Sequence, residues 1–172
     1  MRKILLLFSI LFFITFLACT GSSTSQSPIT SEPVAGVSSG DQLATLEKSS
    51  KYICHARITK VSSRYERYDI QSALVMSRIT LDILENWKGN LIPGTEIRSF
   101  GGIIDGIPYE ISDGPSVLFQ ENEEVVLFLN DFPGGIFPVL GQSGKYPVTN
   151  GVVGSTGDSL EKFSEKIKAL IQ

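Results

Sequence analysis

The sequence predicts a mainly β domain, built from five or six short strands and followed by a C-terminal amphipathic helix. Apolar and polar residues alternate with a period of two in several segments, which is typical of strands. Clusters of Gly, Pro and Asn separate these segments and predict turns. Helical spacing of apolar residues is confined to the two ends of the domain, residues 41–172. A chain of this size buries a sizeable core, because about 150 residues remove roughly two thirds of their unfolded surface from water.

The elements are expected in a regular order. A short helix comes first, and the strands follow it: Asp41–Lys48 for the helix, then Tyr52–Thr59, Val75–Leu84, Thr95–Phe100, Val125–Leu129, Ile136–Leu140 and Lys145–Val148. The first strand alternates in a way that predicts burial of one face. Cys54 is expected in the core and His55 at the surface, since consecutive strand residues point to opposite faces. Gly141–Gly144 predicts a hairpin turn between the last two strands.

The closing helix has the strongest signal. Its apolar residues recur at helical spacing through the last residues of the chain, at Leu160, Phe163, Ile167, Leu170 and Ile171. Asp158 and Glu161 have the spacing of a capping box, which predicts Asp158 as the N-cap. The apolar stripe of this helix is expected to cover an open end or face of the sheet.

The N-terminus has the composition of a secretory signal. Residues Met1–Ala18 begin with two cations and continue with a largely apolar run from Ile4. That run is shorter than the roughly 20 residues that a membrane-spanning helix needs. The segment Phe16–Ala18 followed by Cys19 resembles the lipobox of bacterial lipoproteins, which implies that Cys19 is acylated and becomes the new N-terminus. An uncleaved membrane anchor and free secretion are the alternatives, and all three place the chain outside the cytoplasm.

A tether is expected between the lipid and the domain. Residues 19–40 contain the lipid anchor and a segment dominated by Ser, Thr, Gly and Pro, a composition typical of disordered linkers. Thr20, the residue after the Cys, is not the Asp that retains some Gram-negative lipoproteins at the inner membrane. We therefore expect the protein in the cell envelope, anchored to the outer face of a membrane, and in the outer membrane if the organism is Gram-negative.

Composition excludes several classes of function. The chain has 15 Lys and Arg against 18 Asp and Glu, and its net charge of −3 argues against nucleic-acid binding. One His and two Cys fall short of the four His and Cys ligands of a structural zinc site, and acylation of Cys19 would leave only two such residues. No metal site and no cofactor are therefore expected.

Two short strings resemble catalytic motifs. Gly157–Leu160 spells the signature of the GDSL hydrolases, but no His follows Ser159 to act as its base, and a helix cap accounts for the same residues. Gly141–Lys145 lacks the first Gly and the final Ser or Thr of a phosphate-binding loop. We expect no enzymatic activity. A small envelope hydrolase using carboxylates, and a purely structural envelope component, remain the alternatives.

The order of strands resembles the OB-fold, and within it the netrin-like domain of tissue inhibitors of metalloproteinases. The resemblance covers about 100 residues, Lys51–Val148, and rests on the stretches KYICHARITKV, ILENWKG, TEIRSFGG and FQENEEVVLFLNDFPGGIFPVLGQSGKYPV. It implies a small OB-like β-barrel. Those inhibitors use a free N-terminal Cys and several disulfides, so no inhibitory residue is transferred to this chain.

Two predicted loops carry the candidate binding residues. Ser62–Ser72 joins the first two strands, a connection that helps OB-fold proteins to bind oligosaccharides or oligonucleotides. Gly101–Phe119 is long for a loop without regular structure, which hints at function. The candidate partner-binding residues are Arg64, Tyr65, Arg67 and Tyr68 in the first loop and Ile103 and Ile104 in the second. The sequence thus favours a tethered binding module for an envelope or extracellular protein, peptide or glycan, with protease inhibition as a narrower hypothesis.

Overall fold

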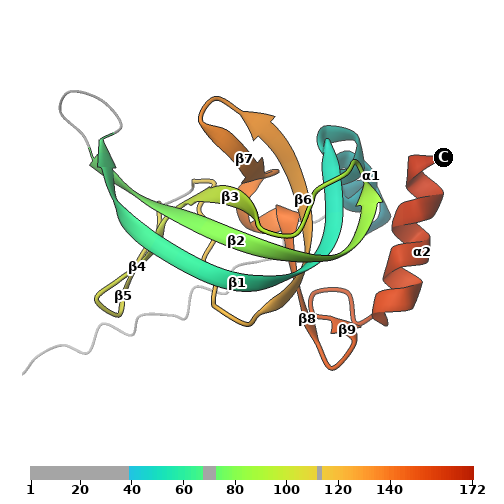
Figure 1. Cartoon of the computed structure of the whole chain (residues 1–172). Helices are drawn as coiled ribbons and strands as arrows, with labels where there is room; N and C mark the ends of the chain where they lie inside the picture. Colours follow the sequence, from blue (N-terminus) through green and yellow to red (C-terminus); the bar gives the residue numbers. More distant parts are fainter. Residues whose placement is uncertain (1–38, 68–72, 112–113) are drawn as a thin grey trace, which may run out of the picture. The chain divides into compact units, whose positions relative to one another are not determined.

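The computed structural model describes residues 39–67, 73–111 and 114–172 and confirms a mainly β fold with a C-terminal helix (Figure 1). The elements are α1 (Ser39–Ser49), β1 (Tyr52–Arg67), β2 (Ala73–Lys88), β3 (Thr95–Phe100), β4 (Gly102–Ile104), β5 (Ile107–Tyr109), β6 (Glu124–Phe132), β7 (Gly135–Pro138), the 3-10 turn η1 (Gly141–Gly144), β8 (Lys145–Thr149), β9 (Val152–Val153) and α2 (Leu160–Ile171). The signal segment, Cys19 and most of the expected tether lie outside the described residues.

The described residues contain more strands than the sequence predicted. Seven of them form one antiparallel sheet in the order β3-β2-β1-β6-β8-β9, with β7 also paired to β6. One edge of β6 pairs with β1. Its other edge pairs with β7 and then with β8, with Leu129 opposite Pro138 and Leu127 opposite Lys145. The strands β4 and β5 form a separate hairpin.

The sheet is open and does not close into a barrel, which corrects the expectation of a small OB-like barrel. Closure would require the terminal strand β3 to pair with β7, and no such ladder forms. Instead, the Arg98 side chain of β3 crosses to the β6–β7 turn, where Nη1 donates to the carbonyl oxygen of Gly134 at 3.1 Å. The rings of Phe100 and Phe137 also meet across this seam, with centroids 5.5 Å apart. Side chains thus fill the place where backbone pairing would close the barrel.

The first part of β1 is buried on both faces, whereas the sequence predicted burial of one. Cys54 packs in a core with residues of β2, β3 and β6. Ile53 belongs to a second core beneath the helices, together with Phe128 of β6. The register of β1 against β2 shifts between Ile58 and Lys60, which breaks the simple alternation of faces.

The two helices cover the second core on one side of the sheet (Figure 1). The ring of Phe163 in α2 lies 5.2 Å from the ring of Tyr146 and 6.2 Å from that of Trp87, measured between centroids. Ion pairs fasten both helices to β2, from Lys88 to Glu47 at 2.7 Å and from Lys168 to Glu85 at 2.7 Å. The predicted closing helix is therefore confirmed, and it covers a face of the sheet.

The predicted N-cap of α2 is wrong by one residue. Ser159 is the N-cap, and its Oγ accepts a hydrogen bond from the backbone N–H of Lys162 at 3.3 Å. Asp158 pairs instead with the side chains of Lys166 at 2.5 Å and Lys162 at 3.0 Å. These two cations neutralise the carboxylate that the sequence pattern assigned to the cap.

Both predicted loops contain regular structure. β1 continues to Arg67 and β2 begins at Ala73, so most of the described part of Ser62–Ser72 is strand. The segment Gly101–Phe119 contains the β4–β5 hairpin. The long arm of β1 is exposed on much of its surface, so its sequence lacks the alternation that marks a half-buried strand.

The predicted hairpin turn at Gly141–Gly144 is also wrong. These residues form η1, which connects β7 to β8. The two strands do not pair with each other, because both pair with successive parts of β6.

Candidate functional site

The structure brings residues of the two predicted loops to the same end of the sheet. Of the predicted partner-binding residues, it places Arg64, Tyr65 and Arg67 on β1 and Ile103 and Ile104 on β4. Tyr68 and the predicted lipid-attachment residue Cys19 lie outside the described residues. The described candidates divide between two surfaces with different chemistry.

The first surface is an aromatic contact between the long arm of β1 and the β4–β5 hairpin. The rings of Tyr65 and Tyr109 pack edge to face, with centroids 5.7 Å apart. Tyr65 and Ile107 both remain 56% exposed. We call Tyr65, Ile107 and Tyr109 the hairpin patch. Ile103 pairs with Pro108 and so faces the other side of the hairpin.

A hydroxyl network fixes this hairpin to the sheet. The Oγ atoms of Ser63 and Ser77 lie 2.8 Å apart, and Ser77 donates to the carbonyl oxygen of Gly101 at 2.7 Å. The backbone N–H of Ile103 donates to Ser63 Oγ at 3.2 Å. A Cβ atom at Gly102 would lie only 2.3 Å from Ser77 Oγ. The absence of a side chain at Gly102 therefore permits the approach of the two elements.

The second surface begins with a cluster of arginines around Glu66. Arg64 lies 2.9 Å and Arg78 3.9 Å from the Glu66 carboxylate, and Arg98 forms a close ion pair with it. Burial opposes ionisation of Glu66, but the hydrogen bond from Arg64 and the three positive charges together hold the pKa of its carboxyl below the ordinary value. Arg67, the neighbouring residue on β1, has no carboxylate partner among the described residues. We call Arg64, Glu66, Arg67, Arg78 and Arg98 the arginine cluster.

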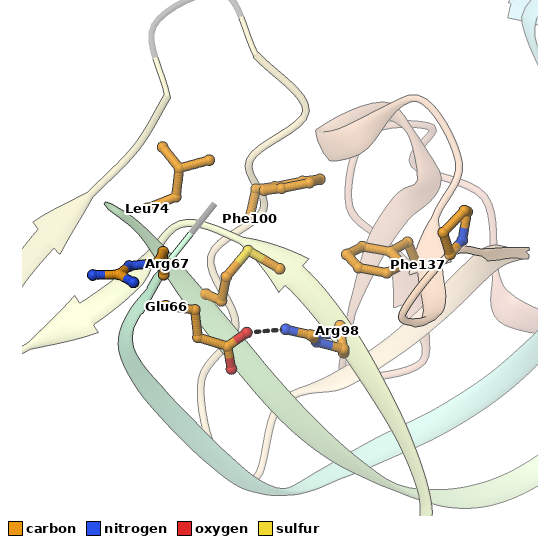
Figure 2. Close-up of a pocket in the computed structure, with 8 residues that line it drawn as sticks. Glu66, Arg67, Leu74, Arg98, Phe100 and Phe137 are labelled. Carbon is orange, nitrogen blue, oxygen red and sulfur yellow. Dashed lines mark hydrogen bonds and ion pairs between the residues drawn. The ribbon is translucent and has the colours of Figure 1, made fainter. Parts of the chain in front are cut away.

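An apolar groove adjoins the arginine cluster. Figure 2 shows the Glu66–Arg98 ion pair at a pocket of about 200 Å³, with the rings of Phe100 and Phe137 on its far side from Arg67. A larger groove of about 550 Å³ continues past Phe100, Pro133 and Phe137, which line both spaces. We call the larger space the aromatic groove, and the residues that line it are Ser99, Phe100, Pro115, Phe132, Pro133, Phe137, Pro138, Leu140 and Gly141.

Two large apolar side chains of the aromatic groove are exposed to water. Leu140 is 62% exposed and Phe132 is 52% exposed. Leu140 also has a φ of 51°, in the left-handed region that ordinary residues rarely occupy. Strained residues of this kind are concentrated at functional sites. The backbone thus holds an apolar side chain in water at the rim of the groove.

The nucleophile and the base that the sequence contains do not form a catalytic pair. Cys54 is fully buried, as predicted, and burial raises the pKa of its thiol to about 12. His55 was expected at the surface, but it is buried, and its Nε2 lies 2.8 Å from Glu124 Oε1. The prediction for His55 fails because the second core and the Glu124 carboxylate cover the outer face of β1.

The acidic residues around β6 have separate structural partners. Glu123 pairs with the buried Lys145 at 2.7 Å, whereas Glu121 accepts a hydrogen bond from the backbone N–H of Val61 at 3.1 Å. Within the part of the chain that the structure describes, no group of three or more His, Cys, Asp or Glu side chains is placed to hold a metal ion.

The aromatic groove was not predicted from the sequence. Its lining comes from β3, from the segment before Val117, and from the β6–β7 turn, which are far apart in the chain. A signal was present in the segment Phe132–Leu140, where large apolar residues alternate with Pro and Gly. Apolar residues in such a turn-rich segment cannot all enter a core, so some must reach the surface.

The chain matches no protein-family model, and no curated protein is significantly similar to it in sequence. None of the helices within residues 39–67, 73–111 and 114–172 has the length and apolar character required to cross a membrane.

Proposed function

We propose that this protein is a lipoprotein of the cell envelope whose β domain binds an envelope or extracellular protein, peptide or glycan. The signal-like segment Met1–Ala18 and the lipobox-like position of Cys19 support export and lipid anchoring. The anchor would lie in the outer face of a membrane, which in a Gram-negative organism would be the outer membrane. The membrane, through this lipid, and the bound partner are the two interactions proposed.

The aromatic groove is the observation that carries the binding role. Exposed apolar groups that line a concave space mark interaction sites, because a soluble domain gains nothing by keeping them in water. Phe132 and Leu140 are exposed in such a space, and the arginine cluster adjoins it. Aromatic and arginine side chains are the types enriched among residues that dominate binding energy.

The resemblance to netrin-like inhibitors supports a narrower version of this proposal, in which the partner is a metalloprotease. Its test is whether the purified protein slows a secreted metalloprotease of its own organism. A carboxylate-dependent hydrolase is less well supported, because Glu121, Glu123 and Glu124 are each engaged by another group of the protein.

Lipid anchoring is tested with Cys19→Ser. Cells expressing the wild-type chain should incorporate labelled palmitate into the protein, and the protein should fractionate with membranes. The Cys19→Ser chain should incorporate none, because the only proposed acceptor thiol is gone. Equal labelling of the two chains would refute lipidation at this residue.

Binding is tested by photo-crosslinking in intact envelopes. A photoreactive amino acid that replaces Leu140 reports on the aromatic groove. The same photoreactive amino acid in place of Ile92 is the matched control, since Ile92 is 68% exposed and does not line the groove. A discrete adduct that forms only from position 140 supports the binding role. The absence of any adduct from position 140, or the same adducts from both positions, would refute it.

A further inference from the structure

We propose that the aromatic groove and the arginine cluster together bind an extended peptide segment that presents apolar side chains next to an acidic residue. This inference rests on the proposed binding function and names the class of partner. The apolar side chains would occupy the aromatic groove, and the carboxylate would lie at Arg67. The charge, the polarity and the continuity of the two spaces favour such a ligand.

Charge complementarity favours an acidic ligand. Arg64, Arg78 and Arg98 are already engaged by the Glu66 carboxylate. Arg67 lines the same pocket, and Figure 2 shows its guanidinium pointing away from Glu66. The whole chain has a net charge of −3, so a concentration of positive charge beside an apolar groove is a local feature. Arg67 can therefore pair with a carboxylate of a partner without breaking an ion pair with any described residue.

The polarity of the groove favours a peptide over a glycan. Ser99 contributes the only side-chain hydroxyl, amide or charge among the residues that line the aromatic groove. Its hydroxyl is already committed to the carbonyl oxygen and the N–H of Val117, at 3.0 Å and 3.2 Å. The hydroxyl groups of a sugar would lose water there without finding partners, which is costly. Apolar peptide side chains incur no such loss.

The continuity of the two spaces favours an extended ligand. The pocket at the arginine cluster and the aromatic groove share Phe100, Pro133 and Phe137 as common walls. A ligand that reaches both must therefore pass along the seam between β3 and β7. Extended peptides bind in this way, with successive side chains entering separate subsites.

The test uses the full chain, solubilised in detergent, and a displayed library of random peptides. We expect enrichment of peptides in which Asp or Glu stands beside apolar or aromatic residues. A synthetic peptide of the enriched sequence should bind the Leu140→Asn and Arg67→Glu chains at least about tenfold more weakly than the wild type, a change of about 1.4 kcal/mol. Asn is chosen at position 140 because it tolerates the left-handed backbone.

Matched controls separate the groove from general surface effects. Ile92→Asn removes an equally exposed apolar side chain outside the groove, and Lys60→Glu makes the same charge change elsewhere on β1. Both controls should bind within about twofold of the wild type, since neither contacts the proposed ligand. Replacing the acidic residue of the peptide by Lys should weaken binding to the wild type and restore binding to Arg67→Glu.

Three results would overturn the proposal. The first is a library that yields no enriched peptide. The second is an enriched peptide that binds Leu140→Asn and Arg67→Glu as tightly as the wild type. The third is a lysine-containing peptide that does not restore binding to Arg67→Glu. If the photoreactive chain with its label at position 140 still forms a discrete adduct in envelopes, the binding function stands and only the peptide assignment fails. If that adduct is also missing, the proposed binding function and the peptide assignment both fail. A second copy of this chain in the adduct would likewise reject a peptide partner.

Discussion

Substitution of Gly102 by Ala should weaken the attachment of the β4–β5 hairpin and lower the free energy of unfolding. A Cβ atom at this position would lie 2.3 Å from Ser77 Oγ and 2.4 Å from Ser63 Oγ. Ordinary contacts between such atoms are about 3.5 Å, so the hairpin must move by about 1 Å. Ser77 is almost fully buried, and its hydroxyl cannot turn to water in compensation.

The magnitude follows from the hydrogen bonds that this movement breaks. Two of them connect the hairpin segment to the sheet: Ser77 donates to the carbonyl oxygen of Gly101, and the N–H of Ile103 donates to Ser63. At about 0.5–1.5 kcal/mol each, their loss destabilises the protein by about 1–3 kcal/mol. Urea unfolding of the wild-type and variant chains measures this difference, and hydrogen exchange at the Ile103 amide shows where it arises.

Gly106→Ala is the matched control. Gly106 lies in the turn of the same hairpin with a φ of +79°, but a Cβ atom there would have no neighbour within 4 Å. Its replacement should cost only the backbone strain of a left-handed residue, about 1 kcal/mol. The reasoning is refuted if Gly102→Ala is no more destabilising than Gly106→Ala, or if the exchange rate of the Ile103 amide is unchanged.

Two further predictions concern titratable groups. Hydrogen bonds from Lys166 and Lys162 hold the pKa of Asp158 below its ordinary value, so the ionised carboxylate stabilises the fold at neutral pH, and this contribution is lost as the pH falls through the folded-state pKa. Asp158→Asn should therefore lower the unfolding free energy at neutral pH and match the wild type in strong acid; a difference that persists unchanged in acid would contradict this assignment. Burial raises the pKa of the Cys54 thiol to about 12, so in a Cys19→Ser chain iodoacetamide should label Cys54 only when urea unfolds the domain, and rapid labelling of the folded chain would show that the thiol is accessible.

Local patterns predicted the positions of most elements well. Thr95–Phe100 has the same bounds in the prediction and in the structure, because its alternation reflects burial of one face. Leu160–Ile171 is likewise helical, since its apolar stripe is continuous and a whole helix face is buried. The prediction was weaker where both faces share one environment. Ile53–Ala56 are buried on both sides although their sequence predicted burial of one, and the outer arm of β1 is largely exposed, so neither segment has the burial of a half-buried strand.

The candidate site was predicted only in part. Arg64, Tyr65 and Arg67 were singled out by residue type, and the structure places Tyr65 in the hairpin patch and the two arginines in the arginine cluster. Ile103 and Ile104 were singled out within a supposed loop, and the register of β4 and β5 separates them: Ile104 pairs with Ile107 and shares the face of the hairpin patch, whereas Ile103 lies on the other face. The groove residues Phe132 and Leu140 were not identified, because nothing in their own segment shows that Phe100 lies beside them.

The sequence by itself determined the order and type of the two helices and the six longer strands, the burial of Cys54, and the signal-like N-terminus on which the anchoring proposal rests. These properties follow from composition and from periodicities within short segments, which are local. Only the tertiary structure decided that the sheet stays open at β3, that two cores lie on opposite faces of β1, and that the aromatic groove forms along the seam. Each of these depends on contacts between residues distant in the chain, such as Arg98 with Gly134 and Phe100 with Phe137, which no local pattern encodes.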